Sequence, residues 1–400
     1  MHAMTASVLQ MIRRAKSPLS KVEIAEELGV SLSAISVHVE RLLKENLIEM
    51  SRIGVSSGGR KPKEYALNKD FGLIVSIELE TTLVHIALTN FNCEVLCLTS
   101  SDIEITDGPD IVLTRIHEHV EQMLLDNDID KASIKGIGIG IPGPVDFSMG
   151  IPISPPIMPG WDQYPIREFW AKYFDCPCYV DNDVNIMALG EHAKGLKFEV
   201  NNVIFIKIGS GIGSGIIYDG VLYRGSTGSA GDIGHFDIGS DVVCWCGNKG
   251  CLEASAGGKA LISKGKERAI FHNSGYLLDI LNSRGELSME DIGAGLLQLD
   301  SSCVELVRES GALIGKVIAS IVNFANPDLI VIGGRIAEFG DIFLAAIRQS
   351  VYQRSLPLAT RNLIINKSSL GNMAGLIGGA FMTIDQIITQ ATDNQADTYF

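Results

Sequence analysis

Four side chains near the middle of the chain have the types and spacing of a metal site. His235 is followed by Cys244, Cys246 and Cys251, so one imidazole and three thiols fall within seventeen residues. Zinc prefers this mixture of nitrogen and sulfur ligands, and four protein ligands complete a tetrahedral structural site. Inert buried cysteines beside a surface histidine are the alternative, but the Cys-x-Cys spacing and the neighbouring glycines favour chelation. We therefore expect a structural zinc ion that fixes a loop.

Carboxylates flank the expected metal site on both sides. Asp232 precedes it in a glycine-rich stretch at 225–235, and Glu253 follows the last cysteine. Carboxylates accept hydrogen bonds from paired hydroxyl groups, which a sugar offers. The stretch G-S-T-G-S-A-G-D-I-G-H, followed by C-W-C-G-N-K-G-C-L-E, resembles the zinc-anchored sugar loop of the ROK family, named for repressors, open reading frames and sugar kinases. Asp232 stands where that family usually has a glutamate, which shortens the reach of the charge by one methylene.

A second stretch extends the resemblance to the sugar kinases of the family. V-D-N-D-V-N at 180–185 is similar to the kinase pattern E-N-D-A-N. The resemblance implies that Asp183 occupies the position of the catalytic base and that Asn182 contacts sugar hydroxyls. It therefore predicts a sugar pocket with five contact residues: Asn182, Asp183, Asp232, His235 and Glu253.

The nucleotide half of such a kinase pocket is altered in this chain. Kinases of the family open their body with D-x-G-G-T-K, whereas residues 78–83 read E-L-E-T-T-L. Glu80 replaces a glycine and would face the phosphates, and Leu83 replaces the lysine that would compensate its charge. Two like charges about 4 Å apart cost roughly 4 kcal/mol at an effective dielectric constant of about 20. We therefore expect poor ATP binding, although glycine-rich segments at 209–215 and 326–334 are retained.

Two functions from different classes compete for this pocket. A sugar-responsive regulator would use it as a sensor, whereas a sugar kinase with an appended DNA-binding module would use it for catalysis. Asp183 and the second glycine-rich turn support the kinase, while Glu80 and Leu83 favour the regulator, which we predict. Members of the family respond to sugars and to sugar phosphates, so both are candidate effectors. Sequestration by a sugar-transport component is a third alternative that nothing in the sequence selects.

The first seventy residues differ in charge from the rest and carry a helical pair. Residues 1–70 have a formal balance of +3, whereas the remaining chain carries −17. This asymmetry indicates a small separate module whose partner differs from that of the body. Residues 21–28 predict a short amphipathic helix ending at Gly29, and residues 33–44 predict a second helix with one apolar face. Two helices around a glycine turn are typical of a helix-turn-helix, whose second helix enters the DNA major groove.

Two short strands at 47–50 and 64–67 surround a basic loop and complete a winged helix-turn-helix domain at 1–70. The loop contains the run G-R-K-P at 59–62, which suits a narrow, electronegative minor groove, although an ordinary solvated loop is the alternative. We expect the DNA contacts to come from the second helix and the wing: Ser31, Ser33, Ser36, His38, Arg41, Arg52, Arg60, Lys61 and Lys63. The repressors of the ROK family begin with such a module, so the resemblance covers essentially the whole chain.

The remaining residues, 71–400, are expected to form the sugar-sensing body. We predict strands at 71–80, 82–88, 134–140, 203–208 and 329–332, and helices at 111–125, 185–194 and 306–324. Strands that alternate with helices indicate an α/β fold in which helices cover mixed or parallel sheets. The resemblance implies a two-lobed, actin-like ATPase fold of the ribonuclease H type, with the ligand between the lobes and a zinc-anchored loop at 225–253.

Composition excludes some classes of protein. Four hundred residues, of which 46% are hydrophobic and 20% charged, describe a globular chain of two or three domains. No apolar run reaches the roughly 18 residues of a membrane span, and eight cysteines in so long a chain fit a reducing compartment. We therefore expect a cytoplasmic protein whose partners are operator DNA and a sugar or sugar phosphate, with no membrane partner. Paired half-sites on DNA favour a homodimer or homotetramer.

Overall fold

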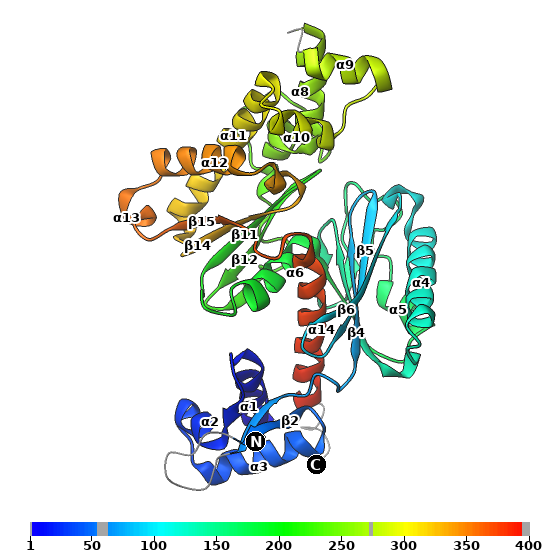
Figure 1. The fold of residues 1–400 in the computed structure, drawn as a ribbon, viewed down its shortest axis with the longest axis vertical. Coiled ribbons are helices and arrows are strands. Elements are labelled where there is room, and N and C mark those ends of the chain that lie inside the picture. Colours follow the sequence, from blue (N-terminus) through cyan, green and yellow to red (C-terminus); the bar gives the residue numbers. More distant parts are fainter. Residues whose placement is uncertain (1, 54–62, 272–274, 394–400) are drawn as a thin grey trace.

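The computed structural model of the chain describes residues 2–53, 63–271 and 275–393. They form an N-terminal module and a body of two lobes, and a long C-terminal helix runs from the lobes to the module (Figure 1). Within these residues, no helix is both long and apolar enough to cross a membrane.

The N-terminal module has the predicted helix-turn-helix at its centre. Outside residues 54–62, which the structure does not describe, it consists of three helices and a three-stranded antiparallel sheet of order β1-β3-β2: α1 (His2–Arg14), β1 (Leu19–Ser20), α2 (Lys21–Leu28), α3 (Leu32–Lys44), β2 (Ile48–Ile53) and β3 (Lys63–Leu67). Ser20 and Glu23 form a capping box at the start of α2, and Gly29 ends that helix with a φ of 64°. Ser31 then caps α3 by accepting a hydrogen bond from the amide of Ala34. The C-cap at Gly29 and the N-cap at Ser31 therefore set the sharp turn between α2 and α3.

The first lobe is built on a five-stranded mixed sheet of order β10-β7-β4-β5-β6. Its elements are β4 (Leu73–Leu79), β5 (Leu83–Asn90), β6 (Val95–Asp102), α4 (Pro109–Asp126), β7 (Ile134–Ile141), β8 (Val145–Asp146), β9 (Ile151–Pro152), α5 (Ile166–Ala171) and β10 (Cys178–Asn182). β4, β5 and β6 are antiparallel neighbours, whereas β7 pairs in parallel with β4 and β10 in parallel with β7. Ile77, Ile86 and Ile139 from adjacent strands are fully buried in its core.

The second lobe repeats the strand arrangement of the first. Its sheet has the order β13-β12-β11-β14-β15: β11 (Val203–Ile208), β12 (Ile212–Tyr218), β13 (Val221–Tyr223), β14 (Leu329–Gly333) and β15 (Ile364–Lys367). Again the first three strands are antiparallel neighbours, and the last two follow in parallel. Two copies of one β-sheet topology facing each other are what the predicted two-lobed actin-like fold requires, so that prediction is confirmed.

Among the described residues of the second lobe, seven α-helices cover its sheet or extend beyond it. They are α7 (Leu252–Ala256), α8 (Gly258–Phe271), α9 (Gly275–Arg284), α10 (Met289–Leu297), α11 (Ser301–Ala325), α12 (Asp341–Arg354) and α13 (Pro357–Thr360). α11, which contains the predicted helix at 306–324, packs against α12. None of α8, α9, α10 and α12 was predicted from the sequence.

Two helices occupy the junction between the lobes. α6 (Asp183–Gly190) follows β10 directly and continues as a π-helical turn (Glu191–Gly195). α14 (Ala374–Asp393) packs on α6 and on β4 and β7 of the first lobe. A side chain at Gly190 or Gly378 would overlap the backbone of the other helix, so these glycines permit the close approach of α6 and α14. The helix that begins in the cleft is thereby tied to the C-terminal helix.

The far end of α14 reaches the N-terminal module (Figure 1). Leu9 and Ile24 of the module share one hydrophobic cluster with Phe91 of the first lobe and with Phe381 and Ile388 of α14. Burial of apolar side chains contributes about 25 cal/mol per Å² removed from water. The module is therefore held against the body by a continuous apolar core.

Candidate functional site

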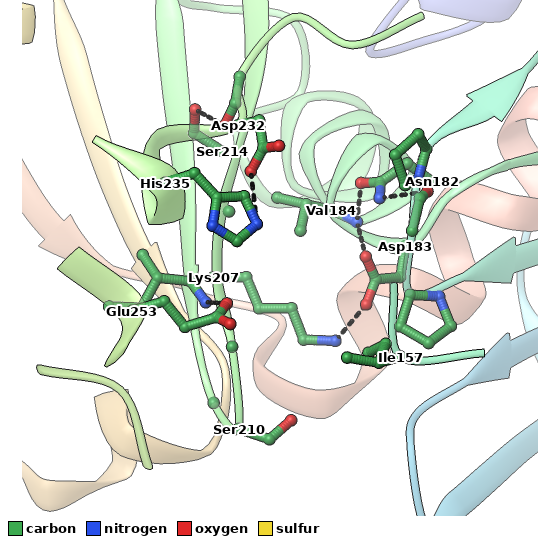
Figure 2. Close-up of a pocket in the computed structure, with 18 of the residues that line it drawn as sticks. Ile157, Asn182, Asp183, Val184, Lys207, Ser210, Ser214, Asp232, His235 and Glu253 are labelled. Carbon is green, nitrogen blue, oxygen red and sulfur yellow. Dashed lines mark hydrogen bonds and ion pairs between the residues drawn. The ribbon is translucent and has the colours of Figure 1, made fainter. Parts of the chain in front are cut away.

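A cavity with an empty volume of about 1170 Å³, including its open mouth, lies between the lobes. All five predicted sugar contacts line it: Asn182, Asp183, Asp232, His235 and Glu253. In Figure 2, the first two face the other three across the cavity. The fold therefore brings together the end of β10 and the loop at 225–253, which are far apart in the sequence.

The junction of β10 and α6 fixes Asn182 and Asp183. Asn182 caps α6 by accepting a hydrogen bond from the amide of Val184, and its Nδ2 donates to the carbonyl of Gly143 at 2.9 Å. Asp183 is buried at 5% exposure. Its Oδ1 accepts from the Val184 amide at 2.8 Å, and its Oδ2 lies 2.7 Å from the ammonium of Lys207. Both oxygens of the expected catalytic base are therefore already hydrogen-bonded.

Lys207 is a site residue that the sequence analysis did not identify. It interrupts the apolar strand β11, and its side chain lines the cavity with 14% exposure. Burial lowers the pKa of Lys207, but its carboxylate neighbours, Asp183 first and then Glu80, outweigh this effect and raise the pKa above its usual value. The lysine is therefore charged at neutral pH. A single cation inside the run V-I-F-I-K-I was the available signal.

Two glutamates stand at the altered first phosphate turn. The amide of Glu80 donates to the carbonyl of Leu83 at 2.8 Å and closes the β4–β5 hairpin, and Glu80 lines the cavity. Glu78 is buried at 3% exposure, and this burial raises its pKa to about 8. A Cβ atom on Gly375, in the first turn of α14, would overlap the Glu78 carboxyl group. The carboxyl group of Glu78 therefore packs against the first turn of α14.

Glu253 supports the second glycine-rich turn. Its Oε2 accepts a hydrogen bond from the amide of Ile212 at 2.9 Å, at the start of β12. The turn itself is closed by the amide of Gly209, which donates to the carbonyl of Gly211 at 2.9 Å. A Cβ atom on Gly211 would collide with the Glu253 carboxylate. Glu253 thus shapes the turn with one oxygen and retains the other for a ligand.

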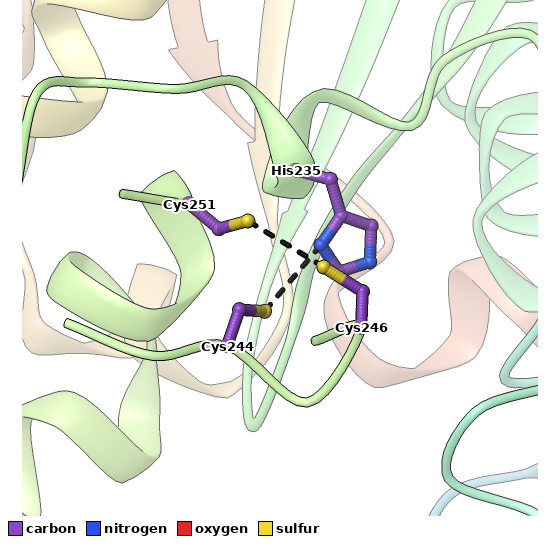
Figure 3. Close-up of side chains that lie close together, drawn as sticks. All are labelled: His235, Cys244, Cys246 and Cys251. Atoms are coloured by element: carbon purple, nitrogen blue, oxygen red, sulfur yellow. Dashed lines mark hydrogen bonds between the residues drawn. The ribbon is translucent and has the colours of Figure 1, made fainter. Parts of the chain in front are cut away.

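The four expected metal ligands converge, as Figure 3 shows. The ligand atoms of His235, Cys244, Cys246 and Cys251 all lie within 4.8 Å of one another. Cys244 Sγ is 3.5 Å from His235 Nδ1, and Cys246 Sγ is 3.6 Å from Cys251 Sγ. Zn–S bonds of about 2.3 Å in a tetrahedron separate two sulfur ligands by roughly 3.8 Å. The cluster therefore has the donor atoms and the spacing to hold a tetrahedral metal ion.

His235 joins this cluster to the cavity. Its Nδ1 faces Cys244, whereas its Nε2 lies 3.9 Å from Oδ1 of Asp232 on the cavity side. An imidazole that binds a metal through one nitrogen keeps its hydrogen on the other, which then serves as a donor. His235 can therefore bind a metal ion and a ligand hydroxyl at the same time.

Most of the expected DNA contacts that the structure describes reach the surface. Exposed or partly exposed are Ser31, Ser33, Ser36, Arg41 and Lys63. Arg41 also forms an ion pair with Glu45 at 2.9 Å. Arg52 belongs to β2, and Arg60 and Lys61 lie outside the described residues.

His38 is the exception, and the prediction that it contacts DNA is wrong. It is 7% exposed, and its Nδ1 lies 2.8 Å from Thr5 Oγ1 in α1. His38 follows Ile35 by three residues and precedes Leu42 by four, so the helical period places it on the apolar face of α3. Val37 is 60% exposed and occupies the outward face instead. Such an apolar side chain suits contact with a thymine methyl group.

Comparisons with known proteins agree with this architecture. Residues 74–386 match the ROK family, and residues 7–49 match a winged helix-turn-helix DNA-binding domain. The xylose repressor of Caldicellulosiruptor bescii is 31% identical over 372 residues, which cover 93% of each chain. A solved ROK family transcriptional regulator, a homologue of the Escherichia coli Mlc protein, superposes with a TM-score of 0.82 at 27% identity and covers 98% of both chains.

A solved kinase of the same family resembles the body. The ROK glucokinase of Streptomyces griseus, in complex with glucose and AMPPNP, superposes with a TM-score of 0.70 at 26% identity. It covers 78% of this chain and 99% of its own. Because the ROK match spans residues 74–386 and the helix-turn-helix match spans residues 7–49, this chain belongs to the ROK family and carries an N-terminal winged helix-turn-helix.

Proposed function

We propose that this chain is a DNA-binding transcriptional repressor whose affinity for its operator changes when a sugar or sugar phosphate occupies the cleft. Residues 1–70 read the operator and residues 71–400 sense the effector, in the cytoplasm. The observation that carries the proposal is the path of α14, which contacts the cleft region at one end and the DNA-binding module at the other.

The two ends of α14 are held by specific contacts. At the cleft end, the hydroxyl of Ser76 in β4 donates to the carbonyl of Leu376 at 2.6 Å. At the module end, Arg13 of α1 lies 2.7 Å from Asp385 and donates to the carbonyl of Phe381 at 2.8 Å. The guanidinium group also lies over the Phe381 ring, 3.8 Å from its centroid. A shift of α14 on effector binding would therefore move the module.

Hydrogen bonds hold the effector on both walls of the cleft. Asp232 and Glu253 accept from sugar hydroxyls, and Nε2 of His235 donates to one. Asn182 and Asp183 bind hydroxyls on the opposite wall. A structural zinc ion on the Cys₃His cluster fixes the loop that carries the first three contacts, and it takes no part in chemistry.

On the DNA, α3 enters the major groove and the wing reaches the minor groove. Ser33, Ser36 and Val37 face the base edges, and Arg41 and Lys63 face phosphates. The chain binds as a homodimer or homotetramer, because two half-sites one helical turn apart require two modules. Closure of the cleft changes the spacing of these modules, which is how the effector alters operator affinity.

Titration of operator binding with sugars tests this function. Operator fragments are first selected from random DNA by the full-length protein, and their Kd is measured with each of a panel of monosaccharides and monosaccharide phosphates. At least one compound is expected to change the Kd by about 5-fold or more, the usual range of allosteric coupling. If none does, the sensor role is wrong; if no DNA sequence is selected, the DNA-binding role is wrong.

A sugar kinase with an appended DNA-binding module is the second candidate. The position of Asp183 in the cavity and the glycine turn at 209–211 favour it, while Lys207 on Asp183 and the charge of Glu80 oppose it. We do not expect ATP to be a cofactor. A coupled assay of ADP formation with hexoses and amino sugars separates the two, since turnover in the usual enzyme range of about 1 to 1,000 per second would establish the kinase.

A further inference from the structure

The charges that line the cleft limit the chemistry of the effector. We infer that the effector is a sugar without a phosphate group, and that Lys207 is a specificity-determining residue because it is committed to Asp183. This inference rests on the proposed function and narrows its effector from two classes to one.

Basic groups suited to a phosphate are scarce in the cavity. Among the described residues, and leaving aside His235 of the metal cluster, the charged side chains that line it are Glu80, Asp183, Asp232, Glu253, Lys207 and Arg335. Four of these are acidic and two are basic. A phosphate ester carries between one and two negative charges near neutral pH, and such groups are bound in proteins by unpaired basic side chains or helix N-termini.

Both basic side chains are already paired with carboxylates. Lys207 lies 2.7 Å from Asp183, and the negative charge of Glu80 acts on it as well. Arg335 lies 2.7 Å from Glu290, and its side chain is half exposed. A phosphate bound at either cation would therefore share that cation with a carboxylate and would still face the remaining carboxylates of the cavity.

The same ion pair suits a neutral sugar. The ammonium of Lys207 carries three donors, of which one is directed at Asp183, and the Asp183 oxygens keep lone pairs for further donors. A sugar hydroxyl both donates and accepts, so it can donate to Asp183 while its oxygen accepts from Lys207. Adjacent donor and acceptor groups on one wall therefore select hydroxyl groups over anions.

The first experiment compares matched ligands on the full-length protein. Binding of neutral aldoses and of their phosphate esters is measured by calorimetry, with thermal shift as the initial screen. An unphosphorylated sugar is expected to bind at least about 100-fold more tightly than its own ester, since each like-charge contact in a partly buried site is strongly unfavourable. An ester that binds as tightly as its sugar, or more tightly, overturns the inference.

The proposed function and this inference fail in different ways. If an ester alone binds and changes operator affinity, the sensor role stands and the choice of an unphosphorylated effector is wrong. If no sugar and no ester binds, the sensor role itself is wrong and the inference falls with it.

Substitutions at the cavity wall test the part played by Lys207. Lys207→Met is expected to weaken binding of the neutral sugar by at least about 10-fold through the loss of one charged donor, and Lys207→Arg should recover part of that loss. Lys367→Met is the matched control. Lys367 is the last residue of β15, its Nζ lies 2.6 Å from Glu338 Oε2, and it is not among the described residues that line the cavity. Unchanged sugar affinity in folded Lys207→Met would rule out the assigned role.

The Glu80→Gln variant tests, independently of Lys207, whether the negative charge of the cavity disfavours a phosphate ester. A purely structural role of Lys207 would not predict its effect. Removing this carboxylate lowers the negative charge of the cavity without touching the Lys207–Asp183 contact. The ratio of ester to sugar affinity is expected to rise, while affinity for the neutral sugar changes little. A ratio equal to that of the unaltered protein would contradict the charge argument.

Discussion

Lys207 and Asp183 form an ion pair on the wall of the cleft, and both oxygens of the aspartate are hydrogen-bonded. A general base must accept a proton from the reacting hydroxyl within hydrogen-bond reach. A carboxylate that already neutralises a lysine is better suited to holding a hydroxyl than to deprotonating it. At the scale of single residues, the cleft therefore has the properties of a binding site.

Glu78 provides a prediction about pH and stability. Burial raises its pKa to about 8 from an ordinary value of 4.5, so the folded protein binds this proton more tightly than the unfolded chain. The free energy of unfolding therefore falls as pH rises from about 4.5 to about 8, and the loss is complete above that range. Glu78→Gln should match the unaltered protein near pH 5 and exceed its stability at pH 8.5 by on the order of a few kcal/mol.

Urea unfolding at pH 5, 7 and 8.5 measures this difference. Glu104→Gln is the control, because Glu104 is exposed and its replacement should leave the pH dependence unchanged. A Glu78→Gln variant whose stability difference does not grow with pH would contradict the prediction.

The loop at 225–253 shows how a metal cluster can position a ligand site. His235 has one ring nitrogen in the cluster and the other toward Asp232, and Glu253 follows two residues after Cys251. At the scale of elements, a metal ion held by this cluster would replace the hydrogen bonds that a longer strand or helix would provide. Loss of the metal should therefore loosen the sugar contacts together.

Cys246→Ser tests this dependence. The variant is expected to lose its zinc and to bind the effector at least about 10-fold more weakly, because removal of groups that support a metal site commonly costs 10- to 100-fold. Metal analysis and calorimetry measure the two effects. Cys97→Ser, in β6 and away from the cluster, should keep one zinc per chain. Zinc retained at full occupancy in Cys246→Ser would show that the cluster is not its site.

Local patterns were enough to predict several elements and the four clustered metal ligands, whereas the cleft positions of Asn182 and Asp183 came from the family resemblance. Gly29 and the apolar face of α3 define the helix-turn-helix from short-range signals. The metal ligands and sugar contacts lie in two compact motifs, so their spacing was visible in the sequence. The resemblance then supplied the pairing of these motifs across the cleft, which no local pattern contains.

Long-range packing explains what the sequence analysis missed. α14 contains Gly375, Gly378 and Gly379, and glycines in a helix interior cost about 1 kcal/mol each relative to alanine. In the structure these glycines make room for Glu78, for α6 and for β4, so tertiary contacts outweigh the local preference. Lys207 was missed because only the folded sheet places it beside Asp183.

At the scale of the whole molecule, α14 joins the sensing cleft to the DNA-binding module. The contact at the module end is a largely buried cation, since the Arg13 side chain is 4% exposed beside Asp385. Removal of one partner from a buried pair is strongly unfavourable, whereas exposed pairs contribute little. The Arg13–Asp385 contact is therefore the position at which communication should be most sensitive.

Asp385→Asn tests the connection. The variant is expected to bind the effector with unchanged affinity and to bind operator DNA, while the effect of sugar on the operator Kd falls toward 1-fold. Lys16→Met is the matched control, because Lys16 pairs with Glu199 at an exposed contact between module and body. A full sugar response in the Asp385→Asn variant would show that the signal follows another route.

Calorimetric titration of the effector, with and without saturating operator DNA, tests the central claim most directly. Coupling between two sites is reciprocal, so operator binding must change the Kd of the sugar by the same factor by which the sugar changes the Kd of the operator. We predict unequal sugar affinities in the free and the DNA-bound protein, related by that factor. Equal affinities in the two states would contradict the account.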